Sequence, residues 1–221
     1  MQLFLIVFLL CAGFVSVYLL WIRPWQLRWG ASSEEVSRVM PGDEIVRKPS
    51  FNATRGVTIT ALPEDVWPWL VQLGVLRGGW YSYDWLDNLG KPSAEQILPQ
   101  FQGLKAGDLV PISPDGKHGL WVKELQPQQW MLWWDKNGGT SWLWVLDPID
   151  GEHTRLITRV RMRYSLRFPD ILFNMLVEFT DIIMMRKCML GIRRRAEALA
   201  IQRRWGSFPT PSELTGLHQD S

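Results

Sequence analysis

The 221-residue sequence predicts an α+β domain in which a curved antiparallel sheet of about six strands is covered by two short helices and one long C-terminal helix. Three observations predict this fold. A meander of short apolar segments, separated by turn residues, occupies the second half of the chain. A long segment without proline follows it, and an apolar stretch opens the chain. Because the apolar face of a sheet must be covered, we expect the long helix to lie across it.

The first element is residues 3–22, which read LFLIVFLLCAGFVSVYLLWI and carry no charge. As a helix this segment would span about 30 Å, which is the thickness of the hydrocarbon core of a bilayer. A cleaved signal peptide is a weaker alternative, because no basic side chain precedes the segment and no small-residue cleavage site follows it. A helix buried in the domain is another alternative. The sequence therefore predicts a single, uncleaved N-terminal transmembrane helix.

Residues typical of a membrane surface follow this segment. Trp21 and Trp25 lie on one helical face, and tryptophan is favoured in the headgroup layer. Arg23 and Arg28 favour a cytoplasmic location for the rest of the chain by the positive-inside tendency. Residues 31–50 are polar and contain a turn signal, so residues 23–50 are predicted to be a juxtamembrane linker. We therefore expect a single-pass membrane protein with its soluble domain on the cytoplasmic side.

The soluble domain is expected over residues 51–204, beginning with a strand and two short helices. Residues 54–61 alternate between apolar and polar side chains, as a strand does. The run PEDVWPWLVQLG, residues 63–74, predicts an amphipathic helix, since proline and acidic residues suit a first turn and glycine ends a helix. Residues 83–88 predict the second short helix.

The meander and the long helix complete the predicted domain. Further strands are expected at 108–112, 119–125, 129–135, 141–146 and 154–164. The residues between them are rich in Pro, Gly, Asn and Asp, as antiparallel connections require. Residues 171–204 then show a broad apolar stripe at helical spacing. Residues 205–221 contain prolines and serines and predict a disordered tail.

A longer run of sequence carries a family resemblance. VWPWLVQLGVLRGGWYSYDWLDNLG, with TRGVTITALP before it and HTRLITRVR and a long helix after it, resembles the SRPBCC superfamily. That group includes the START, birch-pollen-allergen and polyketide cyclase-like helix-grip domains, and the segment most resembles uncharacterised membrane-anchored bacterial members. The resemblance covers roughly residues 41–199. It implies a cavity between the sheet and the long helix that holds a hydrophobic molecule, and it implies no fixed catalytic residues.

The best candidate ligand site is the loop from Arg77 to Trp85, which combines a cation, phenols and a carboxylate that could orient a polar head at a cavity mouth. The predicted ligand-binding residues are Arg77, Tyr81, Tyr83, Asp84, Trp85, Trp133 and Trp142. The alternative is that Arg77 pairs with Asp84 while the aromatic side chains fill the core. A weaker hypothesis makes Tyr81 or Asp84 a general acid or base, so no catalytic residue is assigned.

The end of the domain is basic. Residues 155–204 contain 12 Lys and Arg against 4 Asp and Glu, whereas the remaining residues contain 12 against 18. Alternation places Arg155, Arg159, Arg161 and Arg163 together on the outer face of the last strand. With Arg193, Arg194 and Arg195 of the long helix, this face could contact an anionic membrane leaflet. The alternative is a solvated face paired with acids such as Asp135 and Glu124.

Several classes of function are not expected. The sequence has no HExxH, GxSxG, P-loop, GxGxxG or CxxC motif, and its histidines are isolated from one another. We therefore expect no metal, no cofactor and, with a net charge of only +2, no nucleic-acid partner. Binding of a hydrophobic small molecule or lipid is the function favoured over catalysis. The alternatives are a polyketide cyclase/dehydratase- or hydrolase-like enzyme and an interaction module at the membrane surface, whose protein partner the sequence does not identify.

Overall fold

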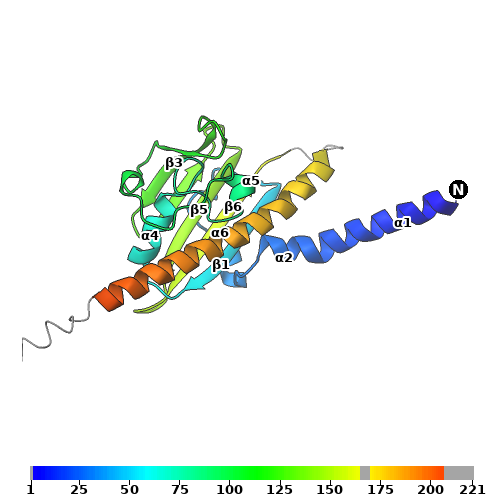
Figure 1. Cartoon of the computed structure of the whole chain (residues 1–221). Helices are drawn as coiled ribbons and strands as arrows, with labels where there is room; N and C mark the ends of the chain where they lie inside the picture. The colour runs from blue at the N-terminus through cyan, green and yellow to red at the C-terminus, as the bar shows by residue number, and fades with distance from the viewer. Residues whose placement is uncertain (1, 165–169, 207–221) are drawn as a thin grey trace, which may run out of the picture.

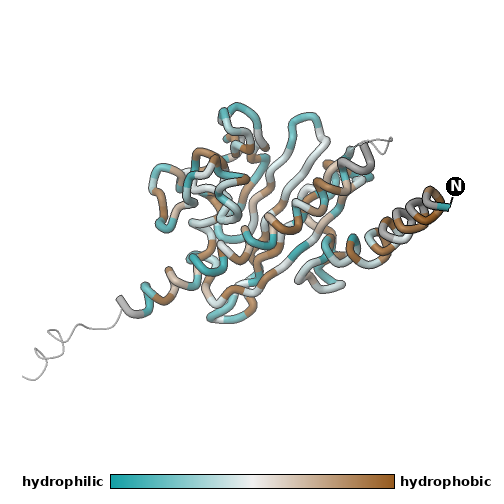
Figure 2. The backbone as a smooth tube through the Cα atoms, turned by 45° about the vertical axis from the view of Figure 1, so that its right-hand side comes forward, coloured by the Kyte–Doolittle hydropathy of each residue, from teal (hydrophilic) through white to brown (hydrophobic). Residues whose placement is uncertain are grey.

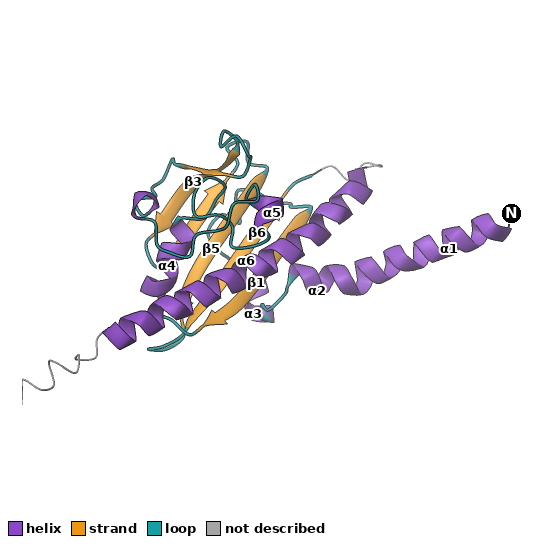
Figure 3. Ribbon diagram, viewed as in Figure 1, coloured by secondary structure: helices purple, strands orange, loops and turns teal. Residues whose placement is uncertain are grey.

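The computed structural model describes residues 2–164 and 170–206, which form a six-stranded antiparallel sheet with one long helix across it (Figure 1; Figure 3). The strand order is β1-β6-β5-β4-β3-β2. The strands are β1 (Phe51–Ile59), β2 (Leu109–Pro111), β3 (Gly119–Gln126), β4 (Trp130–Trp134), β5 (Thr140–Pro148) and β6 (Thr154–Met162). The short helices are α3 (Ser33–Ser37), α4 (Pro63–Val71), α5 (Asp84–Asp87) and the 3-10 turn η2 (Pro99–Phe101). The predicted meander and both predicted short helices are confirmed.

The two faces of the sheet follow from the alternation of side chains along each strand. On β4, Trp133 is buried in the main core under the long helix, whereas Leu132 belongs to a smaller cluster on the opposite, convex face. On β5, Trp144 and Leu143 divide in the same way. Because neighbouring residues of a strand point to opposite faces, the period of two decides which tryptophans enter the core.

The long helix α6 (Asp170–Gly206) covers the concave face of the sheet, as the apolar stripe predicts. Met185, Met189, Ile192 and Ala196 are buried along its inner side. Its one interior glycine, Gly191, allows a loop to approach closely, since a Cβ atom there would lie 2.4 Å from the carbonyl oxygen of Tyr81. The helix ends at Gly206, and the rest of the predicted tail lies outside the described residues.

The N-terminal helix differs from the predicted transmembrane helix over residues 3–22. It consists of α1 (Gln2–Val17), a π-helical turn (Tyr18–Ile22) and α2 (Arg23–Leu27). Among the residues that the structure describes, no helix combines the length and the apolar character that crossing a bilayer requires. The π-helical turn interrupts the regular helix at Tyr18. Figure 2 shows α1 as a largely apolar rod that extends away from the sheet.

A buried polar cluster fastens the end of this helix to α6. Glu178 of α6 has a side chain only 4% exposed, and it accepts hydrogen bonds from Arg23 Nε at 2.8 Å and from Arg23 Nη2 at 3.0 Å. The phenol of Tyr18 donates to Glu178 at 3.3 Å, and Gln26 Nε2 donates to Tyr18 at 2.8 Å. Tyr164 also donates to Glu178. Arg23, which was expected at a membrane surface, is therefore an ion-pair partner of α6, while Trp21, Trp25 and Arg28 are exposed.

The segment expected to be a linker, residues 23–50, instead packs on the convex face of the sheet. Its Met40 and Val46 are buried. Asp43 accepts from Arg159 Nη1 at 2.8 Å and from Arg161 Nη1 at 3.0 Å, and Glu35 accepts from Arg155 Nε at 2.7 Å. The prediction that these arginines share the outer face is confirmed. Their partners, however, come from this N-terminal segment rather than from Asp135 or Glu124, because the segment covers the strand that carries them.

Removal of Asp43 tests whether this segment is part of the folded domain. We expect Asp43→Ala to lower the free energy of unfolding by about 3 kcal/mol, because it leaves the buried guanidinium of Arg159 without its carboxylate. The matched control is Asp147→Ala, which breaks an exposed pair with Arg38 and is expected to cost less than about 1 kcal/mol. Urea unfolding of the full chain measures both. Equal losses for the two variants would contradict a packed N-terminal segment.

Candidate functional site

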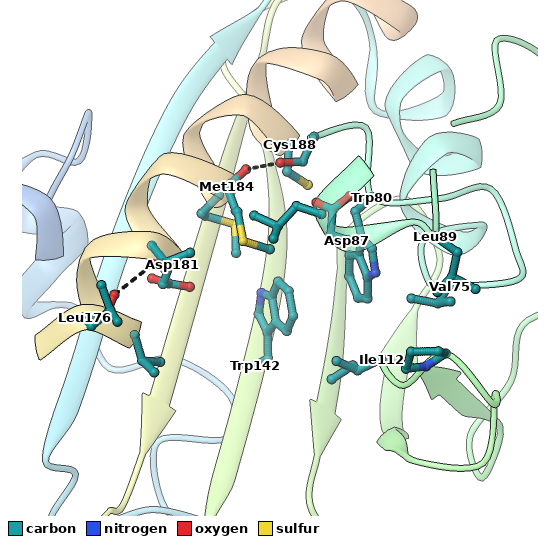
Figure 4. Close-up of a pocket in the computed structure, with 16 residues that line it drawn as sticks. Val75, Trp80, Asp87, Leu89, Ile112, Trp142, Leu176, Asp181, Met184 and Cys188 are labelled. Carbon is teal, nitrogen blue, oxygen red and sulfur yellow. Dashed lines mark hydrogen bonds between the residues drawn. The ribbon is translucent and has the colours of Figure 1, made fainter. Parts of the chain in front are cut away.

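A pocket of about 550 Å³ lies between α6 and the concave face of the sheet (Figure 4). One wall is formed by α6 through Leu176, Val177, Met184 and Met185. The other walls come from the sheet, from the loop before α5, from α5 and from the segment after β2. Most of the lining is apolar, as in sites that hold small organic molecules.

The floor of the pocket is the edge of a tryptophan cluster. Trp142 stacks on Trp80 with ring centroids 5.6 Å apart, and it also contacts Trp144 at 5.3 Å and Trp133 at 5.2 Å. The indole N–H of Trp142 donates to Thr158 Oγ1 at 2.8 Å, which fixes the orientation of the ring. Large rigid rings fill this half of the concave face, and the pocket occupies the space next to them.

The rim of the pocket is apolar and exposed. Leu86, Leu89, Ile112 and Leu176 are among its lining residues, and each is about half exposed or more. They come from α5, from the loop that follows it, from the segment after β2 and from the first part of α6. The pocket therefore opens at the end of α6 that also contacts Tyr18 of the N-terminal helix.

Two hydroxyl groups of the lining, those of Ser82 and Thr180, already have hydrogen-bond partners within the protein. Ser82 Oγ donates to the carbonyl oxygen of Met184 at 3.0 Å, and Thr180 Oγ1 donates to that of Leu176 at 2.8 Å (Figure 4). Two carboxylates, Asp87 and Asp181, complete the polar lining. Asp181 lies 2.7 Å from Nη2 of Arg55, whose side chain is almost fully buried.

Burial shifts the pKa of three groups that line the pocket. It raises the pKa of Asp87, and the nearby charge of Asp84 adds to the rise. It also raises the pKa of Asp181, against the opposing effect of Arg55. The pKa of Cys188 is raised by burial as well, so its thiol stays protonated and is a poor nucleophile.

Among the residues predicted from the sequence, Trp142 lines this pocket. Arg77 does not, and it makes no pair with Asp84. Its guanidinium donates to the carbonyl oxygens of Val71 at 2.7 Å and of Leu73 at 3.1 Å, and it lies over the ring of Phe101. Arg77 thus holds its own loop against the end of α4.

The other predicted ligand-binding residues also lie outside the pocket lining. The phenol of Tyr81 donates to the carbonyl oxygen of Trp69 at 3.2 Å, and Asp84 accepts from Ser93 Oγ. Lys187 Nζ lies 3.7 Å from the ring centre of Tyr83. Trp85 is 74% exposed, and Trp133 is fully buried beneath Trp142. Their contact with a ligand stays a prediction.

The sequence reasoning missed Trp80, Ser82, Asp87 and Asp181 as pocket residues. Trp80 and Ser82 flank Tyr81, whose backbone has a φ of 57°, so that alternate residues of this loop face the pocket. Asp181 had a weak signal, since it interrupts an apolar run of α6 between Phe179 and Met184. A charge in such a stripe indicates either a buried partner or a cavity.

The arginines of α6 that were expected at a membrane surface pair with carboxylates of the protein. Arg193 Nε lies 2.9 Å from Glu197, and Arg194 and Arg195 each place a nitrogen 2.6 Å from Glu95. Arg195 also lies over the ring of Tyr81. Contact of these residues with a membrane stays a prediction. Within the described ranges, no three His, Cys, Asp or Glu side chains come together as a metal site would require.

Comparison with known proteins yields distant structural similarities. No known family and no curated protein matches the sequence. The protein TTHA0849 from Thermus thermophilus is 16% identical, with 66% of this chain and 97% of that chain covered and a TM-score of 0.41. The polyketide cyclase-like protein Cgl2372 from Corynebacterium glutamicum is 15% identical, with 77% and 97% covered and a TM-score of 0.32.

A third similarity is to the di-domain aromatase/cyclase StfQ of steffimycin biosynthesis, which is 16% identical, with 73% of this chain and 54% of that chain covered and a TM-score of 0.40. Polyketide cyclase-like proteins are thus among the structures that this chain resembles. The similarities are too distant to carry an argument about its ligand.

The raised pKa of Asp87 predicts a pH-dependent stability. A folded state that holds a proton to higher pH than the unfolded state loses stability as pH rises above the ordinary carboxyl pKa. We therefore expect Asp87→Asn to gain stability relative to the wild type as the pH rises above about 4, the ordinary carboxyl pKa. Urea unfolding across this range measures the difference.

The control for this experiment is Asp150→Asn. The pKa of Asp150 is lowered by hydrogen bonds from the Glu152 backbone and from His153, so this variant should lose stability relative to the wild type as pH rises. If the Asp87→Asn difference did not change with pH, the carboxyl group of Asp87 would not be buried in solution.

Proposed function

We propose that this protein binds a hydrophobic small molecule or lipid in the pocket between α6 and the tryptophan cluster. The observation that carries the proposal is the pocket itself, whose volume of about 550 Å³ falls in the range of small-molecule sites. Its stacked Trp80 and Trp142 favour a planar or polycyclic apolar body, because flat rings pack best against flat rings. Met184 and Met185 on the opposite wall adapt to irregular shapes.

The two alternatives from the sequence have less support. An interaction module without a ligand would need no cavity, whereas this domain keeps one beside its core. A cyclase- or hydrolase-like enzyme was expected to use Tyr81 or Asp84. Both groups are engaged outside the pocket lining, with Trp69 and Ser93 respectively.

We further propose that the partner supplying this ligand is a lipid bilayer. Exposed apolar side chains gather around the mouth of the pocket, including Leu176 and Val177 of α6. The rod of α1, with exposed Phe4, Leu9 and Leu10, extends from the same end of the molecule (Figure 1). Burying these side chains in a bilayer surface is favourable, and it would bring the mouth close to apolar molecules dissolved there.

Filling the pocket tests the binding proposal. The probe is N-phenyl-1-naphthylamine, an apolar dye whose fluorescence rises on burial. We expect Met184→Trp to weaken its binding at least tenfold, because the indole would occupy the space next to Trp142. The control is Ile183→Trp, which places the same side chain at the adjacent, exposed position. No binding by the wild-type chain, or equal binding by both variants, would contradict the proposed site.

The full chain is required for this test and for native mass spectrometry of co-purified ligands. A fragment starting at residue 31 would lack Arg23, Tyr18 and Gln26, and would leave Glu178 buried without its cation. A reproducible added mass on the wild-type chain, absent from Met184→Trp, would identify the natural ligand.

The bilayer proposal is tested by flotation with vesicles of neutral phospholipid. We expect Leu176→Glu to reduce the bound fraction several-fold, since it puts a charge on the exposed apolar rim of the pocket. Ile201→Glu makes the same change at an exposed position near the other end of α6 and should have little effect. A chain that does not float, or one that floats equally in all three forms, would overturn this proposal.

A further inference from the structure

We propose that the pocket selects ligands that carry a positively charged amine on their apolar body and discriminates against carboxylates of the same shape. This inference rests on the proposed function and names the ligand class of that site. It follows from the charges of the lining. The ionisable carboxyl groups of the lining are Asp87 and Asp181. No lysine or arginine of the described residues lines the pocket.

Asp87 is the principal recognition group. Both of its carboxylate oxygens are buried, and neither accepts a hydrogen bond of normal geometry within the described part of the chain. The hydroxyl of Ser82 donates to the carbonyl oxygen of Met184, and Ser82 and the Tyr83 backbone only partly oppose the rise that burial causes in the pKa of Asp87. A buried carboxylate whose charge is so weakly compensated is unfavourable, and an ammonium group supplies both hydrogen-bond donors and the opposite charge.

Asp181 contributes a second negative group with a different role. One of its oxygens faces the buried guanidinium of Arg55, which is not part of the lining. The side chain of Asp181 is 22% exposed, so that the pocket is bordered by the carboxylate while the arginine lies behind it. The charge of Asp181 is thus partly compensated, and the less compensated charge of the pocket is that of Asp87.

The aromatic groups favour the same ligand. Trp80 and Trp142 line the same pocket as Asp87 and Asp181 (Figure 4). A cation over the face of a tryptophan is attracted by the ring, and this attraction is stronger in a desolvated site. An amine placed near Asp87 would therefore meet a carboxylate and an indole together. A carboxylate in the same place would meet a like charge and no cationic partner on the pocket wall.

Three probes of similar size and different charge test this selectivity on the full chain. They are 2-(1-naphthyl)ethylamine, 2-(1-naphthyl)ethanol and 1-naphthaleneacetic acid, measured at neutral pH by calorimetry or by displacement of N-phenyl-1-naphthylamine. We expect the amine to bind at least tenfold more tightly than the acid, with the alcohol between them. Asp87→Asn should reduce the amine-to-acid ratio at least fivefold. Asp147→Asn removes an exposed carboxylate on the convex face and should leave the ratio unchanged.

The outcomes separate this inference from the proposed function. If the acid binds as tightly as the amine, or if Asp87→Asn leaves the ratio unchanged while N-phenyl-1-naphthylamine still binds, the amine preference is wrong and the apolar site stands. If none of the four compounds binds the wild-type chain, the proposed function fails and the amine preference fails with it. Circular dichroism of the two variants establishes that each is folded.

Discussion

The position of α6 on the sheet depends on a row of buried ion pairs near the start of that helix. Glu178 pairs with Arg23 from the N-terminal helix, and one turn later Asp181 pairs with Arg55 of β1. A buried charge that loses its partner costs several kcal/mol, so these contacts fix the helix both along the strands and about its own axis. The same contacts make α2 part of the domain. Since α6 forms one wall of the pocket, the ion pairs also help to hold that wall in place.

The pocket lies where rigid tryptophan rings of the sheet face flexible and small side chains of α6. Trp133, Trp142 and Trp144 form a rigid, interlocked surface on the concave face of the sheet. Farther along α6 the facing residues are methionines and small side chains, which cannot follow the outline of the rings. Dense packing is therefore reached beneath the cluster, while the space beside Trp142 is left open. The carboxylates that border this space make it chemically selective as well as apolar.

Much of the fold was predictable because it follows from local periodicity. The alternation along β4 correctly separated Trp133 from Trp134, and the stripe of α6 correctly identified the covering helix. The site was less predictable. Of the predicted residues Trp142 lines the pocket, whereas Arg77 caps the carbonyl groups of α4 and Tyr81 bonds to Trp69. Two other side chains of the predicted loop, Trp80 and Ser82, line the pocket.

By itself, the sequence determined the order of the elements, the two faces of each strand and the long helix that covers one of them. These properties depend on residues a few positions apart, so the local periodicity of the sequence is enough to predict them. Only the tertiary structure decided that residues 23–50 pack against the sheet and that Asp87 and Asp181 border one pocket. Those outcomes depend on partners far apart in the chain, such as Arg159 and Asp43, which are separated by 116 positions and lie 2.8 Å from each other. The choice among many arginines and carboxylates is made by geometry, which charge and periodicity alone do not specify.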